Sequence, residues 1–462
     1  MLDAIEVVKL GLNLGVDFID VRLQDYYSEY ILLDNGVIRE INTSHIRGVG
    51  IRVVVNGVTG YSSTYSLDKS EVERAVLRAY KVAKASFKAP HKVSFQERPT
   101  SRGRVSSSYS LEPEDIDFSE KISVLKAMDS VARGVSGIIS VTLRLGYERD
   151  NRVYASSSGD YVECSRRMVG VSTRLVALVE GTYETLYDQK SSVAGWEFIK
   201  SSNWDEWVLE RAKLVVESAK APSVNPGQYD VVLDNEMVGL MLHEAFGHAA
   251  EGDTVLAGNS ILGGKLGEKI ASDLVTIVDN GLVEGGVFVP YDDEGTPKKK
   301  TYLVKEGVLA GYLHSLTTAK FLRGEPTGNA RVMSYQHPLL VRQTNTYMEP
   351  GDWEVEEMVR DMKMGLYISG CGSMGGQVNP LMGSFTFTSG PSYIVEGGEP
   401  KKLVKGVMLS GLILETLKKV DAVGRDLVVR TSVFGGCGKD NQVVRVGGGG
   451  PHVRVRGFTI GG

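Results

Sequence analysis

The sequence has few cysteines and no long apolar run. Three cysteines in 462 residues are too few for a disulfide framework, so we expect reduced thiols that are free to bind a metal. No stretch approaches the roughly 20 apolar residues that span a bilayer. Asp3, Glu6 and Lys9 interrupt the apolar core that a signal peptide would need at the N-terminus. The sequence therefore predicts a cytoplasmic protein with no membrane partner.

An excess of basic residues is also missing. The chain has 52 Lys and Arg against 57 Asp and Glu, for a net charge of −5, whereas phosphate binding favours a basic face. We therefore expect no direct contact with nucleic acid. The hydrophobic share of 42% and the charged share of 24% are typical of a soluble globular protein. A chain of 462 residues is too long for one core and should divide into domains.

The first block, residues 1–90, is predicted to be an α+β unit. An N-terminal helix precedes alternating strands, and the turn signals DNG at 34–36 and NG at 56–57 separate β-rich runs. A second helix is expected over 68–86 because apolar side chains recur there at helical spacing: Val72, Ala75, Val76, Ala79 and Val82. The Ser-, Pro- and Arg-rich stretch 87–112 predicts a linker or surface loop.

The second block, residues 113–222, has the same predicted order of helix, strands and helix. Its helices are expected at about 119–133 and 205–220, and Cys164 lies in a strand between them. The shared order is compatible with an internal duplication, although the residues themselves match poorly.

The third block, residues 226–462, is predicted to be a strand-rich, glycine-rich domain built of sheets or a partly closed barrel. Its first helix should begin near Asp234 or Asn235, both good N-caps. This helix runs EMVGLMLHEAFGHAAEG and is apolar nearly all round, which predicts burial. Buried histidines and glutamates need partners, because burying an unpaired charge is costly.

The stretch HEAFGH differs by one residue from the HExxH signature of zinc proteases. His243 and His248 are five residues apart, and on an ideal helix of about 100° per residue they would point about 140° apart. Three arrangements are open. The helix contains a π-bulge, or it ends at Gly247, whose freedom in φ returns His248 to the site, or it stays straight and presents Glu244, His248 and Glu251 on one face.

Several motifs together resemble the TldD/PmbA family of metalloproteases. They are HEAFGHAAEGD, YDDEGTP at 291–297, PTGNARVMSYQHPLLVRQTNTYMEPGD at 326–352, and GCGKDNQ with GGGGPHVRVRGFTIGG in the last 27 residues. The resemblance covers the third block well and the first two blocks more loosely. Cys371 and Gly450 depart from the expected pattern.

The resemblance implies a ligand set and a mechanism. By position, His243, His248 and Cys437 would bind Zn²⁺, and Glu244 would be the catalytic general base. Two imidazoles and one thiolate leave a fourth position for water, as in catalytic zinc sites. His452 is the competitor for the third ligand position. Arg331 and Tyr335 are predicted substrate contacts.

Other chemistry-bearing residues have simpler interpretations. His314 and His337 are predicted to be structural or on the substrate side, and Cys164 is predicted to be structural. The run PKKK at 297–300 is typical of a solvated turn.

Three function classes follow from the resemblance. The first is a zinc metallopeptidase that hydrolyses unfolded or short peptides, with the dimer enclosing the metal. The second is a non-catalytic peptide-binding subunit of a two-subunit protease, and the third is an accessory protein in DNA topology control. The intact HEAFGH favours the first, with a partner that is a second copy or a related chain lacking the motif. The natural substrate and the choice between endo- and exopeptidase are not predicted.

Overall fold

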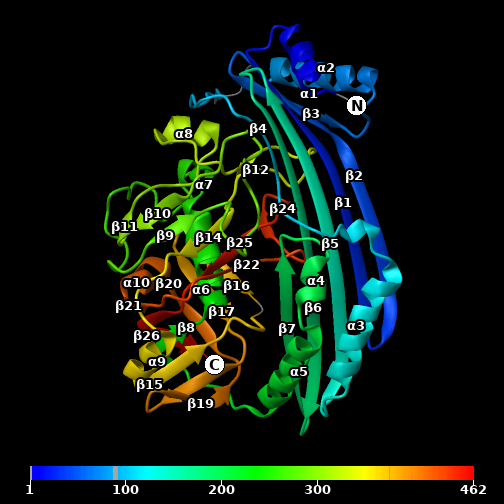
Figure 1. The fold of residues 1–462 in the computed structure, drawn as a ribbon. Coiled ribbons are helices and arrows are strands. Elements are labelled where there is room, and N and C mark those ends of the chain that lie inside the picture. Colours follow the sequence, from blue (N-terminus) through cyan, green and yellow to red (C-terminus); the bar gives the residue numbers. More distant parts are fainter. Residues whose placement is uncertain (1–2, 87–91, 374, 462) are drawn as a thin grey trace.

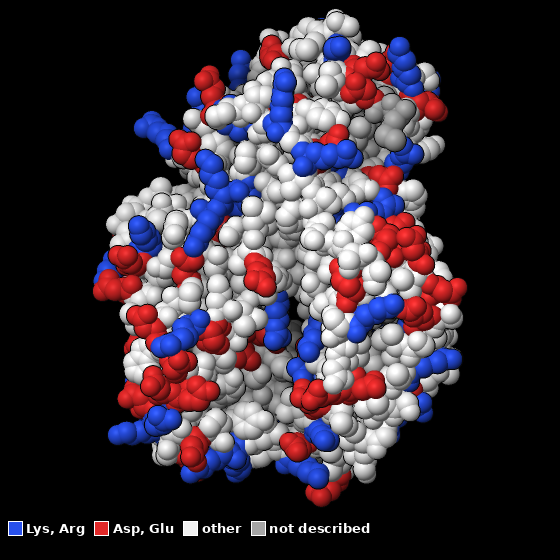
Figure 2. Space-filling view, viewed as in Figure 1, with Lys and Arg blue, Asp and Glu red and all other residues white. Residues whose placement is uncertain are grey.

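Residues 3–86, 92–373 and 375–461 are described by a computed structural model (Figure 1). Helices and strands are mixed along the chain, and strands predominate, which confirms the expected strand-rich α and β composition. No helix within these ranges is long and apolar enough to cross a membrane. Acidic and basic side chains are interspersed over the face drawn in Figure 2, where a hollow separates two halves of the molecule.

One seven-stranded sheet joins the first two blocks. Its strands run in the order β3-β2-β1-β5-β6-β4, with β7 also paired to β6. β1 and β5 are antiparallel neighbours over 15 residue pairs, from Asp20↔Ser156 to Asp34↔Thr142. The strands are β1 (Phe18–Asp34), β2 (Val37–Val55), β3 (Val58–Thr64), β4 (Arg102–Ser106), β5 (Ile138–Ser156), β6 (Tyr161–Val179) and β7 (Thr182–Ser192).

The predicted hairpin turns of this sheet are confirmed. Asn35-Gly36 joins β1 to β2 with φ of 49° and 81°, and Asn56-Gly57 joins β2 to β3 with φ of 52° and 77°. Two successive left-handed residues match the twist of the flanking strands. Glu180-Gly181 forms a third such turn, with φ of 51° and 82°, and glutamate gave no turn signal.

The predicted linker contains a strand. Residues 87–91 lie outside the described ranges, but β4 pairs in parallel with β6 from Arg102↔Tyr161 to Ser106↔Ser165. The prediction of loop alone was wrong, because an edge strand of five residues with one solvated face carries little apolar signal.

Helices cover one face of this sheet near its two ends (Figure 1). α1 and α2 pack on β1, β2 and β3, whereas α3 and α5 pack on β5, β6 and β7. In α2 the predicted inner residue Val82 is 46% exposed and Ala83 is buried instead. The helices are α1 (Ala4–Leu12), α2 (Lys69–Ala85), α3 (Phe118–Arg133), α4 (Glu197–Ser201) and α5 (Trp204–Lys220), with a 3₁₀ turn η1 (Pro113–Asp115).

The opposite face of the sheet is polar and packs on the C-terminal block. Buried Arg52 on β2 pairs with Asp20 on β1 and, at 2.9 Å, with Glu294 of the C-terminal block. Arg152 Nη1 on β5 donates to Asp293 Oδ1 at 2.8 Å. Ion pairs that cross this boundary fix how the sheet faces the third block.

Two larger sheets build the C-terminal block. A six-stranded sheet has the order β11-β10-β9-β14-β25-β22, and a nine-stranded sheet has the order β16-β17-β20-β26-β8-β15-β18-β19, with β21 beside β26. The strands of the first are β9 (Ile277–Asp279), β10 (Thr301–Lys305), β11 (Val308–Leu309), β14 (Asn345–Met348), β22 (Val428–Thr431) and β25 (Gly447–Gly450). Those of the second are β8 (Gly227–Leu233), β15 (Met364–Ile368), β16 (Gly375–Asn379), β17 (Ser384–Thr388), β18 (Ser392–Glu396), β19 (Glu399–Val404), β20 (Met408–Leu412), β21 (Val420–Val423) and β26 (Val453–Gly461).

Short elements complete this block. Two small hairpins, β12 (Ala330–Arg331) with β13 (Leu340–Val341) and β23 (Cys437–Lys439) with β24 (Gln442–Val444), stand apart from the larger sheets. The helices are α6 (Asn235–Met241), α7 (Gly252–Leu256), α8 (Leu316–Leu322), α9 (Val355–Met362) and α10 (Ile413–Lys418).

The glycine run Gly447–Gly450 is a strand, β25, and it supports α6. A Cβ added to Gly239 of α6 would lie 2.6 Å from the backbone nitrogen of Gly449. The helix therefore packs directly on a strand without side chains, and its apolar residues join a core shared by both sheets. The backbone of the motif helix is held deep inside the block.

The run PKKK is not a solvated turn at Lys298, and this prediction was wrong. The Lys298 side chain is fully buried, and its Nζ lies 2.6 Å from Asp279 Oδ1. It also donates to Asn329 Oδ1 at 2.8 Å. The sequence alone does not reveal which lysine of a charged run is buried beside a carboxylate.

Candidate metal centre

The motif helix changes its winding at the histidines. Asp234 caps α6 by accepting a hydrogen bond from the Met237 backbone N at 2.8 Å. From Leu242 to Gly247 the chain forms a π turn, η2, followed by a 3₁₀ turn, η3, over His248–Ala250. A π turn bonds residues five apart, so it places His243 and His248 above one another. Of the three arrangements open from the sequence, the structure has the π turn.

Gly247 serves packing and not backbone freedom. Its φ and ψ are −62° and −42°, which any residue adopts, so the idea that a flexible Gly247 returns His248 to the site was wrong. A Cβ at this position would lie 1.9 Å from Gln343 Oε1. The glycine is required because Gln343 passes against the helix.

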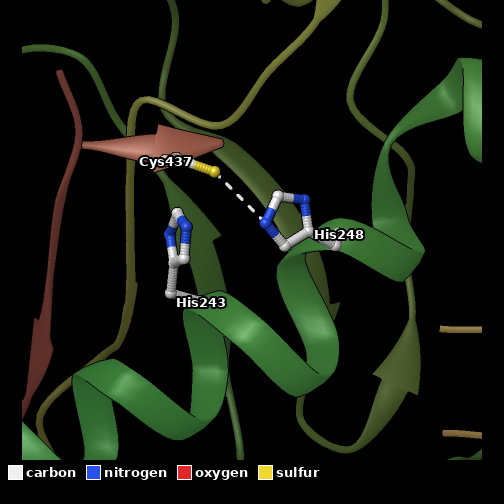
Figure 3. A group of neighbouring side chains, drawn as sticks. All are labelled: His243, His248 and Cys437. Atoms are coloured by element: carbon white, nitrogen blue, oxygen red, sulfur yellow. Dashed lines mark hydrogen bonds between the residues drawn. The ribbon is translucent and has the colours of Figure 1, made fainter. Parts of the chain in front are cut away.

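Three donors converge from two distant segments. The rings of His243 and His248 have centroids 5.2 Å apart, and Cys437 on β23 approaches them from across the site (Figure 3). Cys437 Sγ lies 3.1 Å from His248 Nε2. One ligand atom from each residue falls within 4.8 Å of the other two. This geometry allows all three to bind one ion.

A buried carboxylate orients His248. Glu251 Oε2 lies 3.1 Å from His248 Nδ1, which leaves Nε2 to face Cys437. Lys439 Nζ donates to the same Glu251 oxygen at 2.9 Å and to Asp253 at 2.6 Å. A carboxylate on the second nitrogen of a ligand histidine fixes its tautomer and ring orientation. Glu251 therefore supports the site from behind, and the straight-helix arrangement with Glu251 as a ligand is excluded.

The electrostatics of the three donors favour a bound cation. Burial alone would raise the pKa of Cys437, but the neighbouring imidazoles of His243 and His248 outweigh burial and lower that pKa to about 5. Burial lowers the pKa of His248, but its hydrogen bonds with Cys437 and Glu251 prevail and raise it to about 10. The pKa of Cys437 therefore favours the thiolate, which is the form of cysteine that binds a metal ion.

Buried polar side chains hold the backbone of both segments. Gln343 Nε2 donates to the His243 carbonyl at 3.0 Å. The fully buried Arg342 donates from Nη2 to the Cys437 carbonyl. Sequence reasoning assigned no role to these two residues or to Lys439. The signal was present, because the polar run RQTN at 342–345 and the lysine two residues after Cys437 lie inside the recognised motifs.

One structural observation indicates that these three residues could hold a metal ion. His243 Nδ1 is buried and has no hydrogen-bond partner among the described residues, although buried polar atoms are nearly always paired. A thiolate with two imidazoles suits a zinc ion. Glu244, next to His243, is half-buried, and the structure gives its carboxylate no hydrogen bond or ion pair within the described ranges.

Three other histidines, which the sequence analysis considered, have partners elsewhere. His452, the competitor for the third ligand position, lies 2.6 Å from Asp426 through Nδ1 and 2.9 Å from Tyr367 through Nε2. His314 is buried beside Thr318, and burial lowers its pKa to about 4. His337 Nδ1 contacts Ser334 Oγ at 2.8 Å. None of these three belongs to the converging group.

The two predicted substrate contacts lie outside that group as well. Tyr335 is 2% exposed, and its ring lies where a Cβ on Gly48 of β2 would be. Arg331 is 6% exposed and donates to two backbone carbonyls. Substrate contact stays a prediction for both residues.

Two histidines on one helix and a distant cysteine define a candidate metal-binding protein. Comparison with known proteins agrees with this class. The chain matches the PmbA/TldA metallopeptidase C-terminal domain over residues 226–462, the metallopeptidase domain 1 over 19–83 and the central domain over 111–221. The protein belongs to the PmbA/TldD metallopeptidase family.

Individual relatives span the whole chain. A metalloprotease of Methanothermobacter thermautotrophicus is 36% identical over 97% of this chain and 96% of its own length. A zinc metalloprotease TldD homolog of Saccharolobus solfataricus is 26% identical over 98% of this chain and 99% of its own length. A crystal structure from Thermotoga maritima, described as a modulator of a DNA gyrase, has a TM-score of 0.82 at 22% identity and covers 99% of this chain and 98% of that chain. At that identity the likeness extends to the fold alone.

Proposed function

We propose that this protein is a zinc-dependent peptidase in which His243, His248 and Cys437 hold the metal and Glu244 is the general base. The observation that carries the proposal is the convergence of two imidazoles and one thiolate. His243 lies in the π turn and His248 directly follows it, whereas Cys437 lies on a hairpin 189 residues further along the chain than His248. Relatives called metalloprotease or zinc metalloprotease support the same reading.

A zinc ion held by these three residues would activate a water molecule for attack and polarise the substrate carbonyl. The chain supplies the remaining chemistry. The Glu244 carboxylate accepts a proton from the attacking water and returns it to the nitrogen of the leaving amine. Glu251 holds His248 in the tautomer that directs Nε2 to the centre. Peptide hydrolysis is the reaction that this set of groups suits best.

Substrate and assembly are proposed from the family resemblance. The substrate is an unfolded or short peptide, bound in extended form by main-chain hydrogen bonds that tolerate many side chains. The chain forms a cytoplasmic dimer with a second copy or with a related subunit that lacks the motif. Neither proposal includes nucleic acid or membrane.

Glu244→Gln separates the peptidase from a non-catalytic binding subunit. The amide has nearly the same shape but cannot accept a proton, so we expect zinc content and folding to be retained and hydrolysis to fall by about 10²- to 10⁴-fold. The measurements are peptide digestion followed by mass spectrometry and metal content on the same sample.

The metal measurement distinguishes the possible failures. Loss of zinc in Glu244→Gln would make the residue a ligand and contradict its role as base. Full activity with full zinc would assign proton transfer to another residue. A wild-type protein that binds zinc and peptide but never cleaves would support the non-catalytic subunit instead.

A further inference from the structure

A cavity of about 290 Å³ lies between the polar face of the N-terminal sheet and the hairpin β23–β24. Strands β1, β5 and β6 form one wall, and residues of β24 and of the segments 288–293 and 331–334 form the other. Eight of its 20 lining residues are charged: Glu148, Asp150, Arg152, Arg166, Asp292, Asp293, Arg331 and Arg445. The proposed peptidase site does not use this space.

Three of the four arginines that line the cavity are matched by carboxylates. Arg152 Nη1 donates to Asp293 Oδ1 at 2.8 Å. Arg166 Nη2 lies 3.1 Å from Glu148 Oε1, and Arg445 Nε lies 2.8 Å from the other oxygen of Glu148. The Nε of Arg166 is still buried without an acceptor among the described residues. The cavity is therefore rich in fixed donors.

Arg331 is the unmatched cation. Within the described ranges no carboxylate lies within 4.0 Å of its guanidinium, although the residue is only 6% exposed. Its Nη1 donates to the Gln343 carbonyl at 2.6 Å and its Nη2 to the Arg445 carbonyl at 2.7 Å, which uses two of its five N–H donors. Burial and the nearby Arg166 lower the pKa of Arg331 to about 9, although Asp293 acts in the opposite direction. A buried cation without a directly paired anion is costly.

The two carbonyls that hold Arg331 belong to the supports of the metal centre. Gln343 also donates through Nε2 to the His243 carbonyl at 3.0 Å. Arg445 directly follows β24, which is the strand paired with the Cys437-bearing β23. A ligand on Arg331 would therefore contact the same framework that positions two of the three metal donors.

We propose that this cavity is a carboxylate-binding site and that Arg331 is its anchoring residue. Asp150 pairs with Arg152, and Asp292 accepts backbone N–H groups, so neither neutralises Arg331 directly. Arg331 can therefore bind one further carboxylate, whereas a phosphate dianion would bring its second charge beside Glu148, Asp150 and Asp293. A planar guanidinium also matches a carboxylate in geometry. The carboxylate belongs either to a free small acid or to a peptide, at its C-terminus or in an acidic side chain. The peptide source rests on the proposed function.

Binding of propionate, a monocarboxylate, to the purified protein, measured by titration calorimetry, tests the site without requiring activity. Propionamide is the neutral probe of similar shape. We expect propionate to bind at least tenfold more tightly than propionamide, and Arg331→Gln to weaken propionate binding by about 10- to 100-fold. Arg454→Gln is the matched control, because Arg454 is also buried but pairs with Asp421 away from this cavity. It should change binding less than twofold.

Arg331→Lys keeps the charge and covers the case in which Arg331→Gln does not fold. We expect it to bind propionate more weakly than wild type but still to prefer it over propionamide. Equal binding of propionate and propionamide by the wild type, or unchanged binding by a folded Arg331→Gln, overturns the proposal.

Peptides bound to inactive Glu244→Gln identify the source of the carboxylate. A preference for a free C-terminus over its amide assigns the terminus, and a preference for Asp over Asn assigns a side chain. Propionate binding with neither preference assigns a free acid, and each of these three results supports a carboxylate site. Carboxylate-dependent binding in a wild-type protein that never hydrolyses peptide would contradict the peptidase while leaving this site intact.

Discussion

The N-terminal sheet and the metal centre differ in the sequence distance of the contacts that build them. Within the sheet, neighbouring strands β1, β2 and β3 are joined by two-residue turns whose Asn-Gly sequence sets the register. In the metal centre, the His248–Cys437 contact joins residues 189 positions apart. Local signals therefore specify the sheet, whereas the centre depends on the packing of the finished fold.

The sheet and the metal centre also differ in the kind of side chain that stabilises them. The sheet presents apolar residues to its covering helices, such as Ile19, Val21, Ile31 and Leu33, all fully buried. The centre is held by buried polar groups. Gln343 donates to the His243 carbonyl, Arg342 donates to the Cys437 carbonyl, and Glu251 contacts the ring of His248. An apolar face tolerates substitution of similar volume, but a polar network loses function when one member is left unpaired.

The largest effect is expected at the one ligand contributed by the distant segment. Cys437→Ser should lose most of the bound metal, more than about 100-fold in affinity, because a soft thiolate is removed from a three-ligand site. Cys371→Ser and Cys164→Ser are matched controls, since both thiols lie outside the converging group. Metal content measured after purification checks this. Loss of metal in Cys371→Ser with retention in Cys437→Ser would show that the ligand was assigned to the wrong cysteine.

The next effect concerns the support behind His248. Glu251→Gln removes the charge that holds Nδ1, and we expect metal affinity about 10- to 100-fold below wild type, by competition with a chelator. Glu415→Gln, at an exposed ion pair with Lys418, is the control and should not change affinity. An unchanged affinity in a folded Glu251→Gln would mean that His248 needs no orienting carboxylate.

The sequence predicts the local features of the fold but only part of the metal centre. The Asn-Gly turns, the position of α5 and the burial of the motif helix follow from local patterns. The sequence also restricted His243 and His248 to three arrangements, because five-residue spacing is incompatible with one face of a regular helix. The sequence alone could not identify the π turn as the correct arrangement, because Gln343, which lies between β13 and β14, packs against that turn.

Several misses have the same physical origin. Lys298 is charged and stands in a lysine run, yet it is buried because Asp279 lies opposite it in the folded block. The conformational freedom of Gly247 suggests a break in the helix, but the backbone at Gly247 is helical and its lack of a side chain accommodates Gln343. In both cases the partner is remote in sequence, so no local pattern reveals it.

Gly247→Ala tests that packing role with a smaller effect. The added methyl would lie 1.9 Å from Gln343 Oε1, and displacing Gln343 should cost about 1–3 kcal/mol of unfolding free energy and weaken metal binding. Gly435→Ala is the control, because no atom of the described ranges lies within 4 Å of its added Cβ. Denaturant unfolding and metal content check both variants. If the two variants behave alike, close packing at Gly247 is not what shapes the π turn.

The smallest effect is expected in the sheet. Gly181 has φ of +82° and open space around its added Cβ, so Gly181→Ala introduces backbone strain alone and should cost about 1 kcal/mol of unfolding free energy. Metal content should stay at the wild-type level, because this hairpin is built from local contacts. A loss of metal in Gly181→Ala would show that the sheet and the centre are coupled more tightly than their separate supports imply.

The most direct test of the account is X-ray absorption at the zinc edge of the purified protein. We predict zinc with two nitrogen ligands at about 2.0–2.1 Å and one sulfur at about 2.3 Å, with a light atom from water completing four ligands. Cys437→Ser should lack the sulfur shell if residual metal remains. A wild-type spectrum with no sulfur, or with carboxylate oxygens in place of the imidazoles, would contradict a centre made of His243, His248 and Cys437.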